Sequence, residues 1–175
     1  MFKSLFSLIF SIFLLSLSWL WLTPCAQATP SFLNSSMTTA ALFHFEGIVP
    51  TNLGIHDGQL SPCPSSPNCV VSQKGDETHQ IEPISYQTDR KTARETLLKV
   101  LSVVPDTTVV EEREDYIHTE SRSKLMGFVD DGEFYFPADE KVIQIRSAAR
   151  LGESDLGVNR RRLEQIRLAM EDLGA

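Results

Sequence analysis

TTVVEEREDYIHTESRSKLMGFVDDGEFYFPADEKVIQIRS, residues 107–147, carries most of the information about how this chain folds. It contains four segments rich in β-branched and aromatic residues, at 107–112, 116–122, 128–136 and 141–147. Such segments are typical of strands. Because only short turns separate them, such as Pro137-Ala-Asp-Glu140, successive strands are expected to pair antiparallel. The stretch therefore predicts a meander of about four strands.

Helical periodicity flanks this meander on both sides. Before it, Thr88 is a plausible N-cap with Asp89 in the first turn, and Pro105 ends the helix. Its expected buried stripe consists of Ala93, Leu97, Val100, Leu101 and Val104. After the meander, a C-terminal helix is expected to bury Leu156, Asn159, Leu163, Ile166 and Met170. A short strand at 81–86 precedes the first helix, and Pro83 confines it to an edge. The order predicts an α+β fold with two helices on one face of the sheet.

The N-terminus has the features of a secretory signal peptide. Lys3 is followed by an apolar stretch at 5–22 and by Ala26-Gln27-Ala28, an A-x-A cleavage signal. Two alternatives remain open: a retained membrane anchor, and a lipoprotein with Cys25 as the lipid-bearing residue, which the proline before that cysteine argues against. The expected organisation is a signal peptide at 1–28, a tether at 29–52 and a single domain at 53–175. No later segment is apolar enough to span a membrane.

The charge of the chain excludes some classes of partner. The net charge is −7, and removing Lys3 with the first 28 residues changes it to −8. Nucleic-acid binding requires a basic face that displaces phosphate counterions, so we expect no nucleic-acid partner. Binding to anionic lipid headgroups is disfavoured for the same reason.

Cys63 and Cys69 are the cysteines that remain after cleavage, in SPCPSSPNC at 61–69. An exported protein enters an oxidising compartment, so a disulfide closing this proline-stiffened loop is the preferred interpretation. Free thiols, or half of a metal site completed by His56 and His79, are the alternatives. Since no metal-binding spacing is present, we predict no metal and no cofactor.

Three blocks of the chain resemble a known family. They are LSPCPSSPNCV at 60–70, GFVDDGEF at 127–134 and RSAARLGESDLGVNR at 146–160. Together they are similar to the domain of unknown function numbered fourteen ninety-nine, found in bacteria and photosynthetic lineages. Gly132 departs from the pattern, because a β-branched residue is expected there. The resemblance implies the extent of the folded domain and supplies no catalytic residue.

The meander carries one cluster of candidate catalytic residues. His118 and Glu120 share one strand face, and Asp131 and Glu133 share a face of the next strand, with Asp130 on the opposite side. A histidine beside carboxylates is suited to proton transfer. Paired carboxylates can also bind Ca²⁺ or Mg²⁺, although the usual loop pattern is absent. The competing interpretation is that these groups form ion pairs across the sheet with Arg122, Arg146 or Arg150.

A second cluster of candidate binding residues lies where the last strand leads into the last helix. It comprises Arg146, Arg150, Asp155, Asn159 and Arg160. Arginines beside a helix N-terminus suit a carboxylate or phosphate ligand. The competing interpretation is an Arg–Asp clamp between helix and sheet, with Asp155 beginning the helix and Asn159 held by hydrogen bonds.

Two functions of different classes follow. The preferred hypothesis is an exported, soluble binding or assembly-accessory module in the periplasm or thylakoid lumen, with a small anionic ligand or a membrane complex as partner. The alternative is an acid–base enzyme that acts on a small anionic substrate in a sheet groove. A structural interaction protein without a small ligand is a third hypothesis. Convergence of the candidates in a pocket would favour the enzyme, and separate ion pairs would favour the module.

Overall fold

The computed structural model describes residues 44–174; the predicted signal peptide, including Cys25, lies outside the described residues. The described chain forms the α+β fold that the sequence predicts. Its elements are β1 (Cys69–Val71), β2 (Ile84–Ser85), α2 (Arg90–Leu101), β3 (Thr107–Glu112), β4 (Tyr116–Arg122), β5 (Val129–Tyr135), β6 (Val142–Ala149) and α3 (Val158–Asp172).

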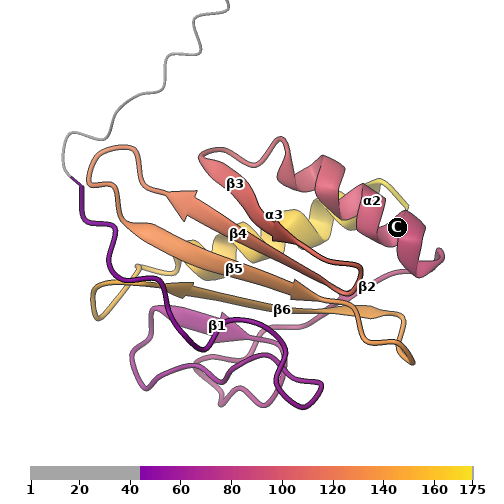
Figure 1. Ribbon diagram of the computed structural model, residues 1–175, viewed down its shortest axis with the longest axis horizontal. Helices are drawn as coiled ribbons and strands as arrows, with labels where there is room; N and C mark the ends of the chain where they lie inside the picture. Colours follow the sequence, from indigo (N-terminus) through magenta and orange to yellow (C-terminus); the bar gives the residue numbers. More distant parts are fainter. Residues whose placement is uncertain (1–43, 175) are drawn as a thin grey trace, which may run out of the picture. The chain divides into compact units, whose positions relative to one another are not determined.

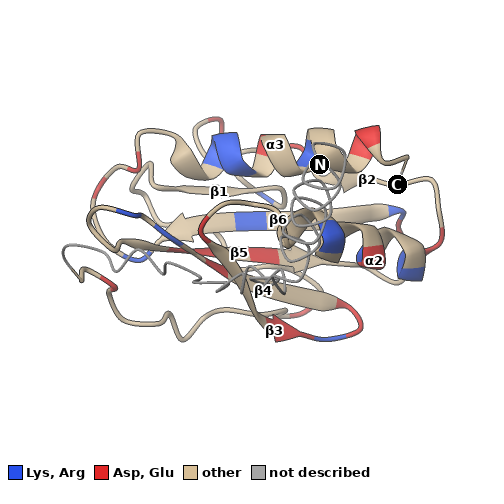
Figure 2. Cartoon of the chain, turned by 90° about the horizontal axis from the view of Figure 1, so that it is seen from above, with Lys and Arg blue, Asp and Glu red and all other residues tan. Residues whose placement is uncertain are grey.

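The strands form one sheet in the order β1-β6-β5-β4-β3, with β2 also paired to β6 (Figure 1). Every strand pairing is antiparallel, as the short turns of the meander predict. Both helices lie on the same side of the sheet (Figure 2). The hydrophobic core lies between the helices and the sheet. It contains Ile117, Phe134 and Ile145 from the sheet and Leu97 and Leu163 from the helices.

Helix α2 begins one residue later than the sequence suggested. Asp89, not Thr88, is the N-cap, because its carboxylate accepts a hydrogen bond from the backbone N–H of Thr92 at 3.0 Å. The predicted stripe faces the core, where Ala93 and Leu97 are fully buried. Val104 packs against that core from beyond the end of the helix.

Helix α3 is shorter at its start than predicted. Leu156 does not belong to its buried stripe, since it precedes the helix and is 83 % exposed. The backbone takes positive φ angles at Leu156 and Gly157, 55° and 74°, and this turn prevents the helix from extending further back. Asn159 is completely buried on the helix, as the spacing indicated.

Strand β1 was not predicted. Prolines make the preceding loop a poor strand, but Cys69–Val71 comes after the last of them and pairs with Arg146–Ala148 of β6. The predicted edge strand is confirmed in shorter form as β2, which begins directly after Pro83.

The first described residues lie against the sheet. Phe45 stacks on Phe128 with ring centroids 5.7 Å apart, and Glu46 forms an ion pair with Arg122. The folded part of the chain therefore reaches back at least to residue 44, into the expected tether. Among the described helices, none combines the length and apolar character that a membrane span needs.

Candidate functional site

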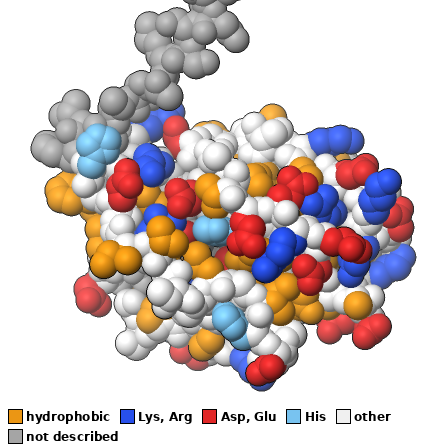
Figure 3. Space-filling view, viewed as in Figure 1, with side chains coloured by type: hydrophobic (Ala, Val, Ile, Leu, Met, Phe, Trp, Pro, Cys, Tyr) orange, Lys and Arg blue, Asp and Glu red, His pale blue; other side chains and the backbone are white. Residues whose placement is uncertain are grey.

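The sheet face turned away from the helices, called here the outer face, collects most of the predicted catalytic residues. Strand register places His118 opposite Glu133, and Glu120 opposite Asp131. Glu133 in turn lies opposite Arg146. Acidic and basic side chains are interleaved over this side of the molecule (Figure 3). The alternation along the strands thus brings the four candidates onto one face.

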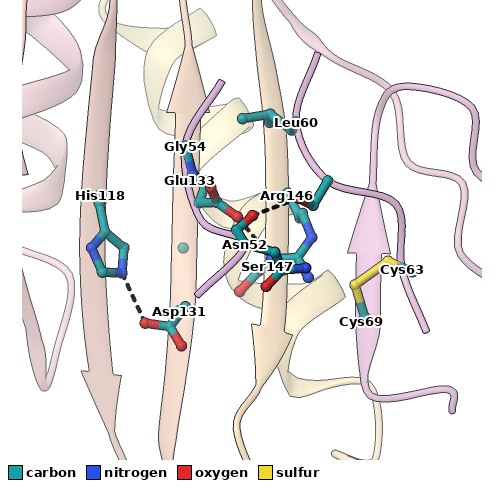
Figure 4. Close-up of polar contacts among 12 residues, drawn as sticks. Asn52, Gly54, Leu60, Cys63, Cys69, His118, Asp131, Glu133, Arg146 and Ser147 are labelled. Atoms are coloured by element: carbon teal, nitrogen blue, oxygen red, sulfur yellow. Dashed lines mark hydrogen bonds and ion pairs between the residues drawn. A yellow bond between two sulfur atoms is a disulfide. The ribbon is translucent and has the colours of Figure 1, made fainter. Parts of the chain in front are cut away.

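Glu133 is completely buried and is the centre of a hydrogen-bond network. Its carboxylate accepts hydrogen bonds from the Gly54 backbone N–H at 2.8 Å and the Arg146 guanidinium at 2.7 Å (Figure 4). It also accepts a hydrogen bond from the Tyr116 hydroxyl at 2.8 Å. Burial and the Glu133 charge raise the pKa of Tyr116. One ion pair and two uncharged donors thus supply hydrogen bonds to the Glu133 carboxylate. Through the Gly54 N–H, Glu133 holds the segment before β1 against the sheet.

Asp131 is the centre of a second network. It bonds Nε2 of His118 at 2.8 Å and receives two hydrogen bonds from Arg150, at 2.8 and 2.7 Å. Arg150 also donates to Glu120. Burial by itself would raise the pKa of Asp131, but Arg150 and His118 outweigh it and hold that pKa below its usual value. Hydrogen bonds to Asp131 raise the pKa of Arg150.

These networks limit what the outer face can do chemically. His118 is only 6 % exposed, and Asp131 and Glu133 are less exposed still. None of the four candidates lines the cavity beside the start of α3 or a second one around Arg90 and Arg94. The arrangement is that of ion pairs across a sheet.

The second predicted cluster is not brought together. Arg146 and Arg150 point into the outer-face networks just described. Arg160 instead donates to the carbonyl oxygens of Gln80 and Thr78, at 2.7 and 2.9 Å. These arginines are therefore engaged within the protein, at separate places.

Asp155 and Asn159 join α3 to the sheet. The Asp155 carboxylate accepts from the backbone N–H groups of Gly157 and Asn159, at 2.9 and 2.7 Å, and so satisfies donors at the start of the helix, although the N-cap residue is Gly157. The Asn159 amide accepts from the Ser147 hydroxyl of β6 and donates to the carbonyl of Asn68. Asn159 thus fastens the helix to the sheet and to the residue before β1.

A cavity of about 290 Å³ lies on the helix side of the sheet, beside the start of α3. Its walls are largely apolar and include Pro105, Phe128, Ala149, Leu151 and Val158. Its polar lining includes Asp130 and Arg162, whose side chains form an ion pair at 2.8 Å. Three serines and the charged residues Asp106, Arg122 and Asp155 also line it. A concave, mostly apolar site with a few polar groups is the usual form of a small-molecule site.

Asp130 has an unusual environment for a carboxylate. Burial raises its pKa, although the hydrogen bond and charge of Arg162 act in the opposite direction. Arg162 also donates to the Asn159 amide oxygen at 2.9 Å. The ion pair is therefore held in place from the helix and sits in poorly solvated surroundings.

The family model described as "Protein of unknown function (DUF1499)" matches residues 59–170. The chain belongs to the DUF1499 family. None of the curated proteins and none of the solved structures matches the chain. The matched range contains every residue named so far as lining the cavity, and it ends at Met170, the last buried residue of α3.

The disulfide predicted for this DUF1499 domain is present between Cys63 and Cys69. It holds Asn68, whose side chain donates to the carbonyl of Gly152 and whose own carbonyl accepts from the Ala149 N–H at 3.0 Å. Gly152 and Ala149 both line the cavity. The bridged loop therefore supports one wall of the cavity.

The two histidines considered as metal ligands have other partners in the DUF1499 domain. His79 bonds Asp76 and the carbonyl of Ser66, and His56 contacts the carbonyl of Asn52. No group of three or more His, Cys, Asp and Glu side chains among residues 44–174 is placed to hold a metal ion.

Arg162 is the site residue that the sequence interpretation missed. It stands three positions after Asn159, so both share a side of the helix that faces the sheet. The sequence prediction placed Asp130 on the opposite side of its strand from Asp131 but offered Arg122, Arg146 or Arg150 as its partner, whereas the partner is Arg162. The side of α3 that carries Arg162 and the side of β5 that carries Asp130 together indicate an ion pair between these two elements.

Proposed function

We propose that this protein is an exported binding module with its ligand site in the cavity beside α3. The observation that carries the proposal is the contrast between the two sides of the sheet. On the outer face the charged candidates pair with one another and do not line this cavity, whereas on the helix side the mostly apolar cavity contains one nearly buried pair, Asp130 and Arg162.

The proposed place of action is the periplasm or the thylakoid lumen. The sequence features of residues 1–28 support export, and the Cys63–Cys69 disulfide fits an oxidising compartment. Fractionation of cells, followed by intact mass measurement, tests this point. The exported protein is expected to begin at Thr29; a cytosolic protein that still begins at Met1 would contradict it.

A small ligand fits the cavity better than a protein segment. The cavity volume of about 290 Å³ lies near the lower end of the roughly 300–1,000 Å³ that is typical of small-molecule sites. Binding of a segment from a membrane complex is the competing form of the same proposal, and it would use the exposed apolar residues around the cavity instead of its interior.

The proposal that the cavity is the ligand site is tested with N-phenyl-1-naphthylamine, an uncharged probe that fluoresces in apolar sites. Val158→Trp places a large ring at the cavity wall, and Leu168→Trp is the matched control because Leu168 is exposed on the same helix away from the cavity. We expect saturable binding by wild type and the control, and about tenfold weaker binding by Val158→Trp. Absence of binding, or equal binding by all three proteins, would reject the cavity as the site.

An acid–base enzyme is the second candidate, favoured by the hydrogen bond between His118 and Asp131. It requires conversion of a bound molecule, not binding alone. His118→Gln would then abolish turnover while probe binding in the cavity is kept. If wild type and His118→Gln both bind a molecule unchanged over time, the enzyme hypothesis fails.

A further inference from the structure

The charged side chains that line the cavity already have partners inside the protein. Asp130 and Arg162 neutralise each other, with side chains only 12 % and 18 % exposed. Asp155 keeps its negative charge, which the hydrogen bonds from two backbone N–H groups and the helix dipole at the start of α3 partly offset. A ligand that enters this part of the cavity therefore meets one closed ion pair and one carboxylate that already has hydrogen-bond donors.

The same holds for the charged residues at the other side of the cavity. Arg122 forms an ion pair with Glu46 at 2.6 Å. Asp106 lies 3.7 Å from the ammonium group of Lys124. These pairs are more exposed than the inner one, and they add no net charge that would select an ionic ligand.

Apolar side chains surround the opening. Phe128, Leu151 and Val158 line the cavity and are each about two fifths exposed, at 38 %, 42 % and 39 %. Leu156, between the last two in the chain, does not line the cavity and is more exposed than these three. An apolar ligand would remove this surface from water at roughly 25 cal/mol for each Å² buried.

We propose that the cavity binds an uncharged amphipathic molecule, with an aliphatic or small-ring body against the apolar walls and a hydroxyl group at the Asp130–Arg162 pair. This inference rests on the proposed function and names its ligand class. A hydroxyl donates to the carboxylate and accepts from the guanidinium without disturbing their pairing. A carboxylate or ammonium headgroup would lose its hydration and gain no free counter-charge.

The raised pKa of Asp130 supports this ligand class. Burial is its main cause, so the inner end of the cavity already disfavours charge. An additional ionic headgroup there would face the same penalty.

Competition against N-phenyl-1-naphthylamine tests the inference with octan-1-ol, octanoate and octylammonium, which share one chain length and differ in headgroup charge. We expect octan-1-ol to displace the probe from wild type at about tenfold lower concentration than either ion. Val158→Trp is the control for displacement outside the cavity. Stronger displacement by octanoate or octylammonium would overturn the inference.

Two variants that leave opposite charges in the cavity are expected to change the order of competitors in opposite directions. The test therefore does not depend on the folding of a single variant. Asp130→Asn leaves the Arg162 charge without its counter-ion, so octanoate is expected to become the best competitor. Arg162→Gln leaves the Asp130 charge, so octylammonium is expected to become the best competitor. Arg167→Gln, whose arginine pairs with Glu164 on the same helix, is the control and keeps the wild-type order.

The outcomes separate the inference from the proposed function. If the probe binds wild type but not Val158→Trp, and an ionic competitor is the strongest, the binding module stands and the ligand class is wrong. An unchanged order of competitors in both charge variants contradicts the role of the ion pair. If the probe does not bind wild type, both proposals fail.

Discussion

Arg146→Met tests the energetic account of the outer face. The methionine keeps much of the arginine's length but removes the one cation that bonds Glu133 within residues 44–174. Glu133 is completely buried, so it would retain the hydrogen bonds from Tyr116 and Gly54 and lose its counter-charge. Breaking a buried ion pair by removing one partner typically costs about 3–5 kcal/mol.

The matched control is Arg167→Met on α3. Arg167 bonds Glu164 and Glu171, both at 2.7 Å, but its side chain is 28 % exposed and water can replace these partners. Exposed ion pairs of this kind contribute about 0–1 kcal/mol. The two substitutions are chemically identical and differ in burial, so the structure predicts a difference of about 3 kcal/mol between them.

Urea unfolding of both variants measures this difference. With a denaturant slope of about 2 kcal/mol/M, Arg146→Met should lower the midpoint by about 2 M and Arg167→Met by less than about 0.5 M. Glu133→Gln combined with Arg146→Met removes both charges and should recover at least about 1.5 kcal/mol relative to the sum of the single changes. Equal midpoints for the two arginine variants, or strict additivity in the double variant, would refute the argument.

Three further predictions follow from particular contacts. A Cβ at Gly132 would lie 2.5 Å from the Thr119 hydroxyl oxygen, so Gly132→Ala should cost about 1–3 kcal/mol in unfolding free energy, and Thr119→Ala should relieve most of that cost; additive effects would contradict the clash. Replacing Cys63 and Cys69 with Ser should cost about 2 kcal/mol in thermal or urea unfolding and also weaken probe binding in the cavity, whereas reduction without effect on either would exclude the support of the cavity wall. The pKa of Asp131 lies below its ordinary 3.8 in the folded protein, so the unfolded chain binds the proton first as the pH falls. The stability of the wild type should therefore decrease as the pH drops below about 4. Asp131→Asn should flatten this dependence in acid titrations followed by circular dichroism, and parallel curves for the two proteins would argue against it.

Strands and helices were predictable because their signals are local. Two-residue alternation at 116–122 places His118 and Glu120 on one face, and the antiparallel meander follows from the short turns. The competing interpretation of the first cluster, with Arg146 and Arg150 as partners of the carboxylates, is what the contacts show. The disulfide followed from two cysteines in one short loop and the expected compartment.

Gly132 shows why a glycine inside a strand was not interpretable from the chain alone. A β-branched residue is expected there, but the Thr119 side chain of the neighbouring strand occupies the space of a Cβ. The reason lies in a residue 13 positions earlier, brought opposite by strand register.

The amino-acid sequence by itself determined the elements, their order and the antiparallel connections, since backbone periodicity and turn chemistry act over a few residues. Only the tertiary structure decided which charge meets which partner, that Cys69–Val71 adds a strand, and that Asp130 and Arg162 share a cavity wall. Those outcomes depend on contacts between residues far apart in the chain, where register, helix docking and burial together select the partner.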